Sequence, residues 1–266
     1  MLCRSHSPSQ LWFRLPKFQA LSIADDDYTR SLDVSVDLLD PILRNGASIF
    51  AVAAFFGASE CLNFMIASSG DITSVFDDKG RHLIHFAAAS THLQVYTAIE
   101  NLIEDTSMTD RNGCTVAHYA ALYGNIEVLK YLWINGFDLE APDHSGNTVM
   151  HFAIVKNQLD VIEFLIENDY CLDSRNHAGQ IPLMLLTYSR QAKRVLDMFL
   201  NHGYDFDQAE ILPYFYGRND RRMVELLLEK GASAEVEAQD GLDLVQHARL
   251  HHNSEMVKLF SKYSFS

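Results

Sequence analysis

A turn-like phrase, Asp-x-x-Gly, recurs at a fixed interval in this chain of 266 residues. Its glycines, Gly80, Gly113, Gly146 and Gly179, follow one another every 33 residues, and Asn176 replaces the aspartate in the last phrase. A period of this length indicates a repeat protein, in which each unit packs only against its neighbours. Stacked units present a long continuous surface, so the periodicity favours binding over chemistry in a closed pocket.

Residues 113–145 show how one period is built. A first helix is predicted to begin near Thr115, a good N-cap residue, and to end at a glycine. The small pair Ala120 and Ala121 would let a neighbouring helix approach closely. A second helix with an apolar stripe follows from Asn125 and ends at an Asn-Gly pair, which suits a left-handed terminator. An extended segment then leads into the next Asp-x-x-Gly turn.

This unit resembles the ankyrin repeat, whose first helix carries the phrase Thr-Pro-Leu-His. The chain has variants of that phrase: His82-Leu-Ile-His85, Thr115-Val-Ala-His118, Thr148-Val-Met-His151 and Ile181-Pro-Leu-Met184. The spacing, the Ala-Ala-x-x-Gly end of the first helix and the leucine-rich second helix carry the resemblance. It implies an all-α repeat solenoid of stacked helix-turn-helix units with β-turn or hairpin fingers, about six to seven in number and degenerate at both ends.

The repeats are expected to cover residues 46–266. After Gly179 the pattern decays, and the next Asp-Gly turn comes at Gly241, 62 residues later, which is short of two full periods. The finger between the fifth and sixth units, around 204–208, should therefore be short or absent. Residues 25–45 are interpreted as a degenerate N-terminal cap. Residues 1–24, basic and containing serines, are interpreted as a frayed or capping segment.

The composition restricts the class of partner and the cellular compartment that we expect. A net charge of −14 argues against nucleic acid, because affinity for the phosphate backbone comes from basic patches. No apolar stretch approaches the roughly 20 residues of a membrane span. The four cysteines form no C-x-x-C pair and suit a reducing compartment. We therefore expect a monomeric cytoplasmic protein, with organelle import through residues 1–24 as the alternative.

A ladder of histidines invites a metal-site interpretation. His85, His118 and His151 lie one repeat apart, a spacing of roughly 10 Å between packed helices that is too wide for a shared ion. The resemblance implies instead that each histidine ties its helix to the preceding turn. The glycines are spaced by the repeat and form no phosphate-binding loop, and no motif marks Cys114 or Cys171 as a nucleophile. We expect no catalytic, cofactor or metal residue, and no enzyme.

The resemblance implies that another protein is bound by turn tips and by the exposed side of the first helices, which together form a concave groove. Carried over position by position, the expected contacts are Phe55, Phe56, Asp78, Lys79, Arg81, Ala89, Ser90, Arg111, Asn112, Cys114, Leu122, Tyr123, His144, Ser145, Asn147, Val155 and Lys156. For Phe55 and Phe56, packing between repeats is an equally open interpretation. The function expected is that of an adaptor or scaffold. The alternative is a regulator or inhibitor of one enzyme through the same groove.

Overall fold

The computed structural model describes residues 47–69, 76–103, 105–187, 189–206, 210–236 and 242–263. All of them belong to the compact unit Ala47–Ser266. The interpretations of residues 1–24 and 25–45 lie outside the described residues.

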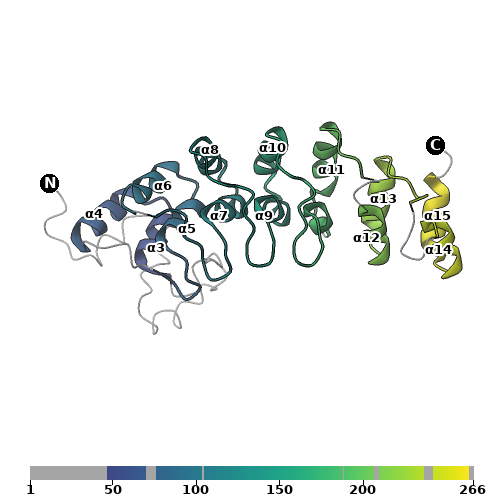
Figure 1. Ribbon diagram of the computed structural model, residues 1–266, viewed down its shortest axis with the longest axis horizontal. Helices are drawn as coiled ribbons and strands as arrows, with labels where there is room; N and C mark the ends of the chain where they lie inside the picture. Colours follow the sequence, from purple (N-terminus) through teal and green to yellow (C-terminus); the bar gives the residue numbers. More distant parts are fainter. Residues whose placement is uncertain are drawn as a thin grey trace, which may run out of the picture. The chain divides into compact units, whose positions relative to one another are not determined.

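Helices follow one another in pairs along this unit (Figure 1). The pairs are, in order, α3 (Ile49–Phe55) with α4 (Ser59–Ser69), α5 (Leu83–Ala89) with α6 (Leu93–Glu100), α7 (Val116–Tyr123) with α8 (Ile126–Ile134), α9 (Val149–Lys156) with α10 (Leu159–Glu167), the 3-10 helix η4 (Pro182–Leu186) with α11 (Ala192–Asn201), α12 (Ile211–Gly217) with α13 (Arg221–Glu229), and α14 (Leu244–Leu250) with α15 (Ser254–Tyr263). We number these helix pairs 1 to 7. An isolated antiparallel bridge joins Phe76 and His82, and no strand is found among the described residues, so the fold is all-α, as predicted.

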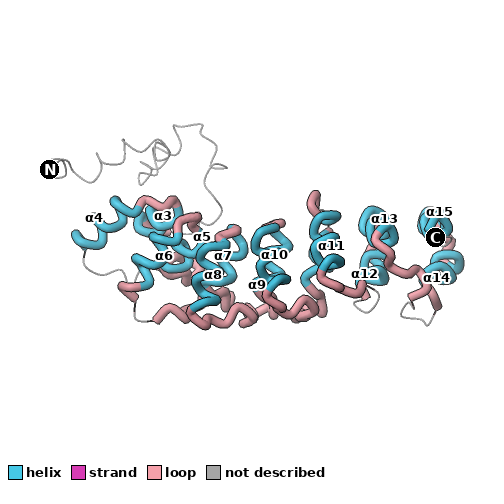
Figure 2. Tube along the Cα trace, turned by 90° about the horizontal axis from the view of Figure 1, so that it is seen from above, coloured by secondary structure: helices cyan, strands magenta, loops and turns pink. Residues whose placement is uncertain are grey.

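The pairs stack in two layers. First helices pack on first helices, α3 on α5, α5 on α7, α7 on α9 and α9 on η4, and second helices contact one another from α6 to α11. From above, loops gather along one side of α8 to α11 (Figure 2). This side carries the fingers, which connect one pair to the next.

Helix α7 begins and ends where the sequence predicts. Thr115 is its N-cap, and Gly124 ends it in the left-handed conformation with φ of 75°. Ala120 and Ala121 are fully buried, and α7 packs against α5 on one side and α9 on the other. The small side chains thus permit the close helix contacts that hold the first-helix layer together.

The connection between the fifth and sixth pairs is short, as the repeat arithmetic predicts. Residues 202–210 separate α11 from α12, nine in all, whereas the fourteen residues 135–148 separate α8 from α9. Of the predicted site of the missing finger, residues 207–208 lie outside the described part. The missing length belongs to the finger, since both helices of the sixth pair are present.

One feature of the fifth pair differs from expectation. Its first helix is a 3-10 helix rather than an α-helix. Leu186 is buried at the position that Ala120 and Ala153 hold in the preceding pairs. Its bulkier side chain removes the small-residue contact that the regular first helices use.

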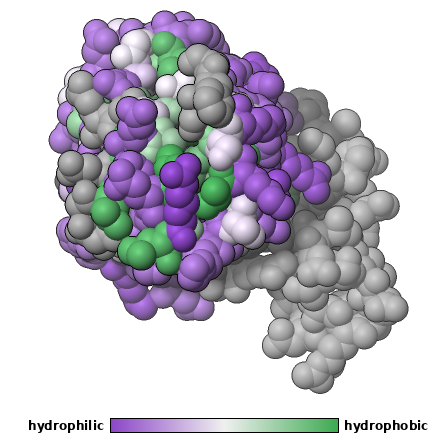
Figure 3. All heavy atoms as spheres, turned by 90° about the vertical axis from the view of Figure 1, so that its right-hand side faces the viewer, coloured by the Kyte–Doolittle hydropathy of each residue, from purple (hydrophilic) through white to green (hydrophobic). Residues whose placement is uncertain are grey.

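The end of the row formed by α14 and α15 is seen in Figure 3, where hydrophilic side chains surround a smaller group of hydrophobic ones. Leu250 is 62% exposed there. A terminal repeat with a largely polar outer face is what a repeat array needs to stay in water.

Candidate functional site

Each Asp-x-x-Gly phrase forms a tight turn at the tip of a finger. The carboxylate of Asp110 accepts backbone N–H bonds from Asn112 at 2.8 Å and from Cys114 at 2.9 Å. Gly113 follows with φ of 78°, a conformation that glycine reaches at little cost. The same two bonds recur at Asp77, Asp143 and Asn176.

Successive fingers are joined through their backbones. Arg111 N–H donates to the Lys79 carbonyl at 2.9 Å, and His144 N–H donates to the Asn112 carbonyl at 2.8 Å. His177 N–H continues the series to Ser145 at 2.8 Å. The four finger tips therefore form one hydrogen-bonded row, in which the side chains project from a fixed backbone.

The buried histidines connect each first helix to its surroundings. In pair 3, Nδ1 of His118 accepts the N–H of Thr115 at 3.1 Å, and Nε2 donates to the Asn147 carbonyl at 3.0 Å. His151 makes the equivalent bonds to Thr148 and to the Gln180 carbonyl. The bond to the preceding turn is confirmed. A second bond, to the following finger, adds to what the sequence predicts.

These histidines are held neutral. An Nδ1 that accepts and an Nε2 that donates define the uncharged imidazole. Burial lowers the pKa of His85 to about 4, against the opposing effect of Asp110. Burial also lowers the pKa values of His118 and His151. With both ring nitrogens in use, the ladder is structural, and no metal-binding group of His, Cys, Asp or Glu is found among the described residues.

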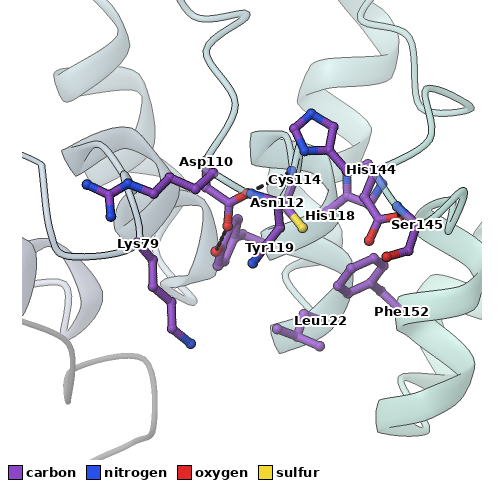
Figure 4. A pocket seen from close by; sticks show the side chains of 12 residues that line it. Lys79, Asp110, Asn112, Cys114, His118, Tyr119, Leu122, His144, Ser145 and Phe152 are labelled. Carbon is purple, nitrogen blue, oxygen red and sulfur yellow. Dashed lines mark hydrogen bonds between the residues drawn. The ribbon is translucent and has the colours of Figure 1, made fainter.

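A hollow of about 340 Å³ opens between the fingers 77–80, 110–113 and 143–146 and the first helices behind them (Figure 4). Its lining is Lys79, Asp110, Arg111, Asn112, Cys114, His118, Tyr119, Leu122, Asp143, His144, Ser145 and Phe152. Lys79 lies on one side of it, and His144 and Ser145 lie on the other. We call this feature the finger hollow.

Its rim and its floor differ in character. Lys79, Arg111 and His144 are exposed at finger tips and supply cationic and hydrogen-bonding groups. Arg111 is oriented by a 2.7 Å bond from its guanidinium to the Asp78 carbonyl in the neighbouring finger. Leu122 and Phe152, both partly exposed, give the floor an apolar component. Such a mixture of cationic rim and apolar floor is typical of protein-binding surfaces.

The deeper groups are inert. Burial, with the charges of Asp110 and Asp143, raises the pKa of Cys114 to about 12, so the sulfur stays a thiol. Burial and a 2.8 Å hydrogen bond to Asp110 raise the pKa of Tyr119 far above its ordinary value. Cys114 and Tyr119 are therefore held in their uncharged forms.

Six of the expected contact residues line the finger hollow: Lys79, Arg111, Asn112, Leu122, His144 and Ser145. Cys114 lines it too, but only 7% of it is exposed. Val155 and Lys156 are exposed at the end of α9, and Asp78 is exposed at its finger tip, but none of the three lines the hollow.

The aromatic residues of the expected groove pack on one another. The ring of Phe55 stands edge-on to that of Phe56 at 5.3 Å and to that of Tyr123 at 5.4 Å. Phe55 lies in pair 1 and Tyr123 in pair 3, while pair 2 has the small buried residues Ala89 and Ser90 at the corresponding positions. For Phe55 the packing interpretation is thus confirmed, although Phe55, Phe56 and Tyr123 all remain partly exposed.

Three expected positions need correction because they are buried. Arg81 is only 3% exposed, pairs with Asp77 at 2.5 Å and stacks over Phe86. Ala89 and the C-cap Ser90 are buried with the rest of α5. Asn147 is partly exposed, donates to Asp143 at 3.1 Å and stays a predicted contact. The first helix of pair 2 therefore has no exposed side of the kind that the resemblance implies.

The sequence interpretation missed Asp110, His118, Tyr119, Asp143 and Phe152 as lining residues. The sequence interpretation assigned the aspartates only to turn formation, although the second carboxylate oxygen of Asp110 also accepts a 2.8 Å hydrogen bond from the Tyr119 hydroxyl. A signal for the aromatic pair was present, since Tyr119 and Phe152 both directly follow the repeated histidine. Tyr119 and Phe152 hold the same position in successive repeats, so both rings lie on the same face of the first-helix layer.

Comparison with protein-family models matches residues 49–143 and 93–176 to ankyrin repeats. Comparison with curated proteins finds no match. No helix in the described part of the chain combines the length and the apolar content needed to cross a bilayer. The family match spans helix pairs 1 to 4, and the same paired-helix pattern continues to α15. The chain is thus an ankyrin-repeat protein.

Proposed function

We propose that this protein is a non-catalytic interaction module, an adaptor or scaffold, that binds another protein across the finger hollow and the finger tips beside it. The family supports the general statement, because ankyrin repeats mediate protein–protein interactions. The observation that carries the finer proposal is the finger hollow itself, with six expected contact residues around it.

The hydrogen-bonded row of fingers favours binding. Each finger is fixed by an internal aspartate or asparagine and by a backbone bond to its neighbour. A surface that is already ordered loses little conformational entropy when a partner arrives, so more of the contact energy is retained as affinity. The cationic rim would steer and orient an acidic or polar partner segment, and the apolar floor would bury its anchor side chain.

The non-catalytic part of the proposal rests on the same residues. The titratable groups in the hollow that have shifted pKa values, Cys114, Tyr119 and His118, are all shifted toward their neutral forms. Neutral groups that are hydrogen-bonded to the fold suit a structural role. Cys114 and Cys171 form no disulfide bond, which agrees with a reducing compartment, and we propose the cytoplasm.

Site-specific photo-crosslinking tests where the partner binds. A photoreactive amino acid would replace Ser145, exposed on the rim of the hollow, in one variant, and Lys130, exposed on α8, in the other. Each full-length protein would be irradiated in cell extract, and crosslinked proteins would be identified by mass spectrometry. We expect one protein to be captured from position 145 and not from position 130.

The captured protein then allows an affinity measurement. Changing Arg111 to Ala should weaken binding by about 1–3 kcal/mol if that guanidinium lies near the centre of the interface. Lys130→Ala should leave the affinity unchanged. Capture from position 130 alone, or equal affinities for the two alanine variants, would assign binding to the second-helix layer and contradict the proposal.

A further inference from the structure

A charge reversal occurs at one repeated position of the second helices. This position is the second residue of the helix, and it recurs every 33 residues from pair 2 to pair 5. It is held by Glu60 in α4, Gln94 in α6, Glu127 in α8, Asp160 in α10, Lys193 in α11, Arg222 in α13 and Glu255 in α15. Only in pairs 5 and 6 is this residue basic.

The reversal runs against helix stability. Acidic side chains are favourable in the first turn of a helix because they meet the positive end of the helix dipole, and basic ones are unfavourable. Helices α4, α8, α10 and α15 have an acidic residue in their first turn, whereas α11 and α13 have none. The helix dipole therefore does not account for the basic residue Lys193, whereas α13 has Asp220 at its N-cap and Arg222 donates to the Ser189 carbonyl of pair 5.

More cations surround the two reversed positions. All six basic residues at the turn ends of pairs 5 and 6 are exposed, and we call them the basic edge: Arg190, Lys193, Arg194, Arg218, Arg221 and Arg222. They concentrate six positive charges in a chain whose net charge is −14. Acidic residues lie at the equivalent position on both sides, Asp160 in pair 4 and Glu255 in pair 7.

Contacts between the pairs bring these cations together. The guanidinium of Arg222 in pair 6 donates to the Ser189 carbonyl of pair 5 at 2.7 Å, one residue before Arg190. Arg218 lies over the Tyr214 ring at 5.6 Å. Arg218 and Arg221 border a hollow of about 360 Å³ together with Thr187 of pair 5.

Half of the basic edge makes no polar contact with the described residues. Arg190, Lys193 and Arg194 form no hydrogen bond or ion pair with the described residues. Arg221 alone forms an ion pair, at 3.6 Å to Glu255, and its side chain is 55% exposed. Unpaired cations fixed on a helical scaffold can bind an anionic group without first breaking internal pairs.

We propose that the basic edge is a second docking surface, separate from the finger hollow, for an acidic segment of a protein partner. Its cations lie on two adjacent helix pairs and are bounded by acidic residues. A short run of Asp and Glu matches a patch of this size. A long nucleic acid would extend past it onto a surface of strongly negative net charge, which would repel the phosphates.

Peptide binding to the full-length chain tests this inference. The probe is a fluorescein-labelled dodecapeptide of alternating Glu and Gly, titrated at 20–50 mM and at about 150 mM salt, a range over which surface electrostatic attraction weakens. We expect binding that falls with salt and that Lys193→Glu weakens roughly tenfold, since a surface charge is reversed rather than removed. Lys258→Glu, exposed on α15, changes the net charge equally and should leave the affinity unchanged.

Three other outcomes would contradict the proposal that the basic edge binds an acidic protein segment. Equal weakening by both variants would show a net-charge effect without a site. Tighter binding of a single-stranded oligonucleotide, lost in Lys193→Glu, would make the occupant a nucleic acid. Self-association that Lys193→Glu abolishes would make it a second copy of the chain. Crosslinking at the finger hollow is measured independently, so either proposal can fail without the other.

Discussion

The regular part of the array contains fingers 77–80 to 176–179. It differs from the part that follows it in the contact between one finger and the next. A β-carbon added to Gly113 would lie 2.5 Å from the His144 ring and 2.9 Å from its backbone nitrogen, and Gly80 and Gly146 are similarly close to the next finger. Gly179 has nothing within 4 Å. Gly80, Gly113 and Gly146 therefore lie against the following finger, whereas Gly179 has no such neighbour among the described residues.

The histidine position changes at the same boundary. His118 and His151 each donate to a carbonyl 29 residues further on, at the base of the next finger. The fifth pair has Met184 at this position. Because its following finger is shortened, a histidine there would bury a donor without that partner, which is unfavourable. The apolar Met184, buried at 4% exposure, avoids this.

The histidine of the first helix, the finger that follows it and the glycine of the preceding finger therefore depend on one another, and together they form one set. Where the finger is complete, the histidine is bonded at both nitrogens and the glycine contacts the next turn. Where the next finger is short, both features change together. The candidate binding surface belongs to the complete set, and the basic edge belongs to the region where the set has been lost.

The largest effect that this comparison predicts is on the pH dependence of folding stability. The pKa of His85 is about 4 in the folded state and near 6.5 when unfolded, so only the unfolded state gains a proton between these values. Stability from His85 is complete above pH 6.5 and is lost toward pH 4, on the order of 3 kcal/mol in total. His118 and His151 shift in the same direction.

Urea unfolding at pH 7.5, 6 and 5 measures this loss. His85→Gln should reduce the dependence of stability on pH, whereas His202→Gln, at an exposed residue outside the ladder, should not. A wild-type stability that is constant between pH 7.5 and 5 would contradict the assignment of neutral buried histidines.

Finger contacts are tested by two matched glycine substitutions. Gly113→Ala places a β-carbon in a left-handed conformation and against His144, so we expect a loss of about 2–4 kcal/mol in unfolding free energy. Gly179→Ala has the same backbone penalty without a neighbour, so about 1–2 kcal/mol is expected. Thermal or urea unfolding of both variants gives the difference, and equal losses would show that the fingers do not support one another.

The small-residue contact in the first-helix layer is tested by Ala120→Leu. Ala120 is fully buried between α5 and α9, and overpacking there should cost about 1–3 kcal/mol. Lys130→Leu, on the exposed face of α8, should change stability by less than about 0.5 kcal/mol. Should Ala120→Leu be tolerated, the bulk of Leu186 could not account for the 3-10 helix in the fifth pair.

The sequence predicted most of the architecture because the repeat converts local signals into global ones. Thr115, Ala120 and Gly113 each define one local feature, and the period places it in every unit. The features that the sequence did not predict depend on side-chain contacts that the repeat pattern does not specify. An arginine next to a turn is expected to be exposed, yet the ion pair of Arg81 with Asp77 places its side chain inside the finger base. Phe55 and Tyr123 lie two pairs apart in the sequence, yet their rings are in contact at 5.4 Å.

The smallest predicted effect separates binding from folding at the basic edge. Lys193→Glu restores an acidic residue at the second position of α11, where Glu127 and Asp160 stand in the regular pairs. The acidic side chain meets the positive end of the helix dipole, so stability should rise by about 0.3–1 kcal/mol at low salt.

The reciprocal change Glu127→Lys, in the regular region, should lower stability by a similar amount. Both effects should shrink in high salt, because exposed charges near a helix end are screened. Thermal unfolding of the two variants at about 20 mM and 500 mM salt provides the measurement. A fall in stability for Lys193→Glu would mean that the cation supports the fold, and the basic edge would then need no partner to explain it.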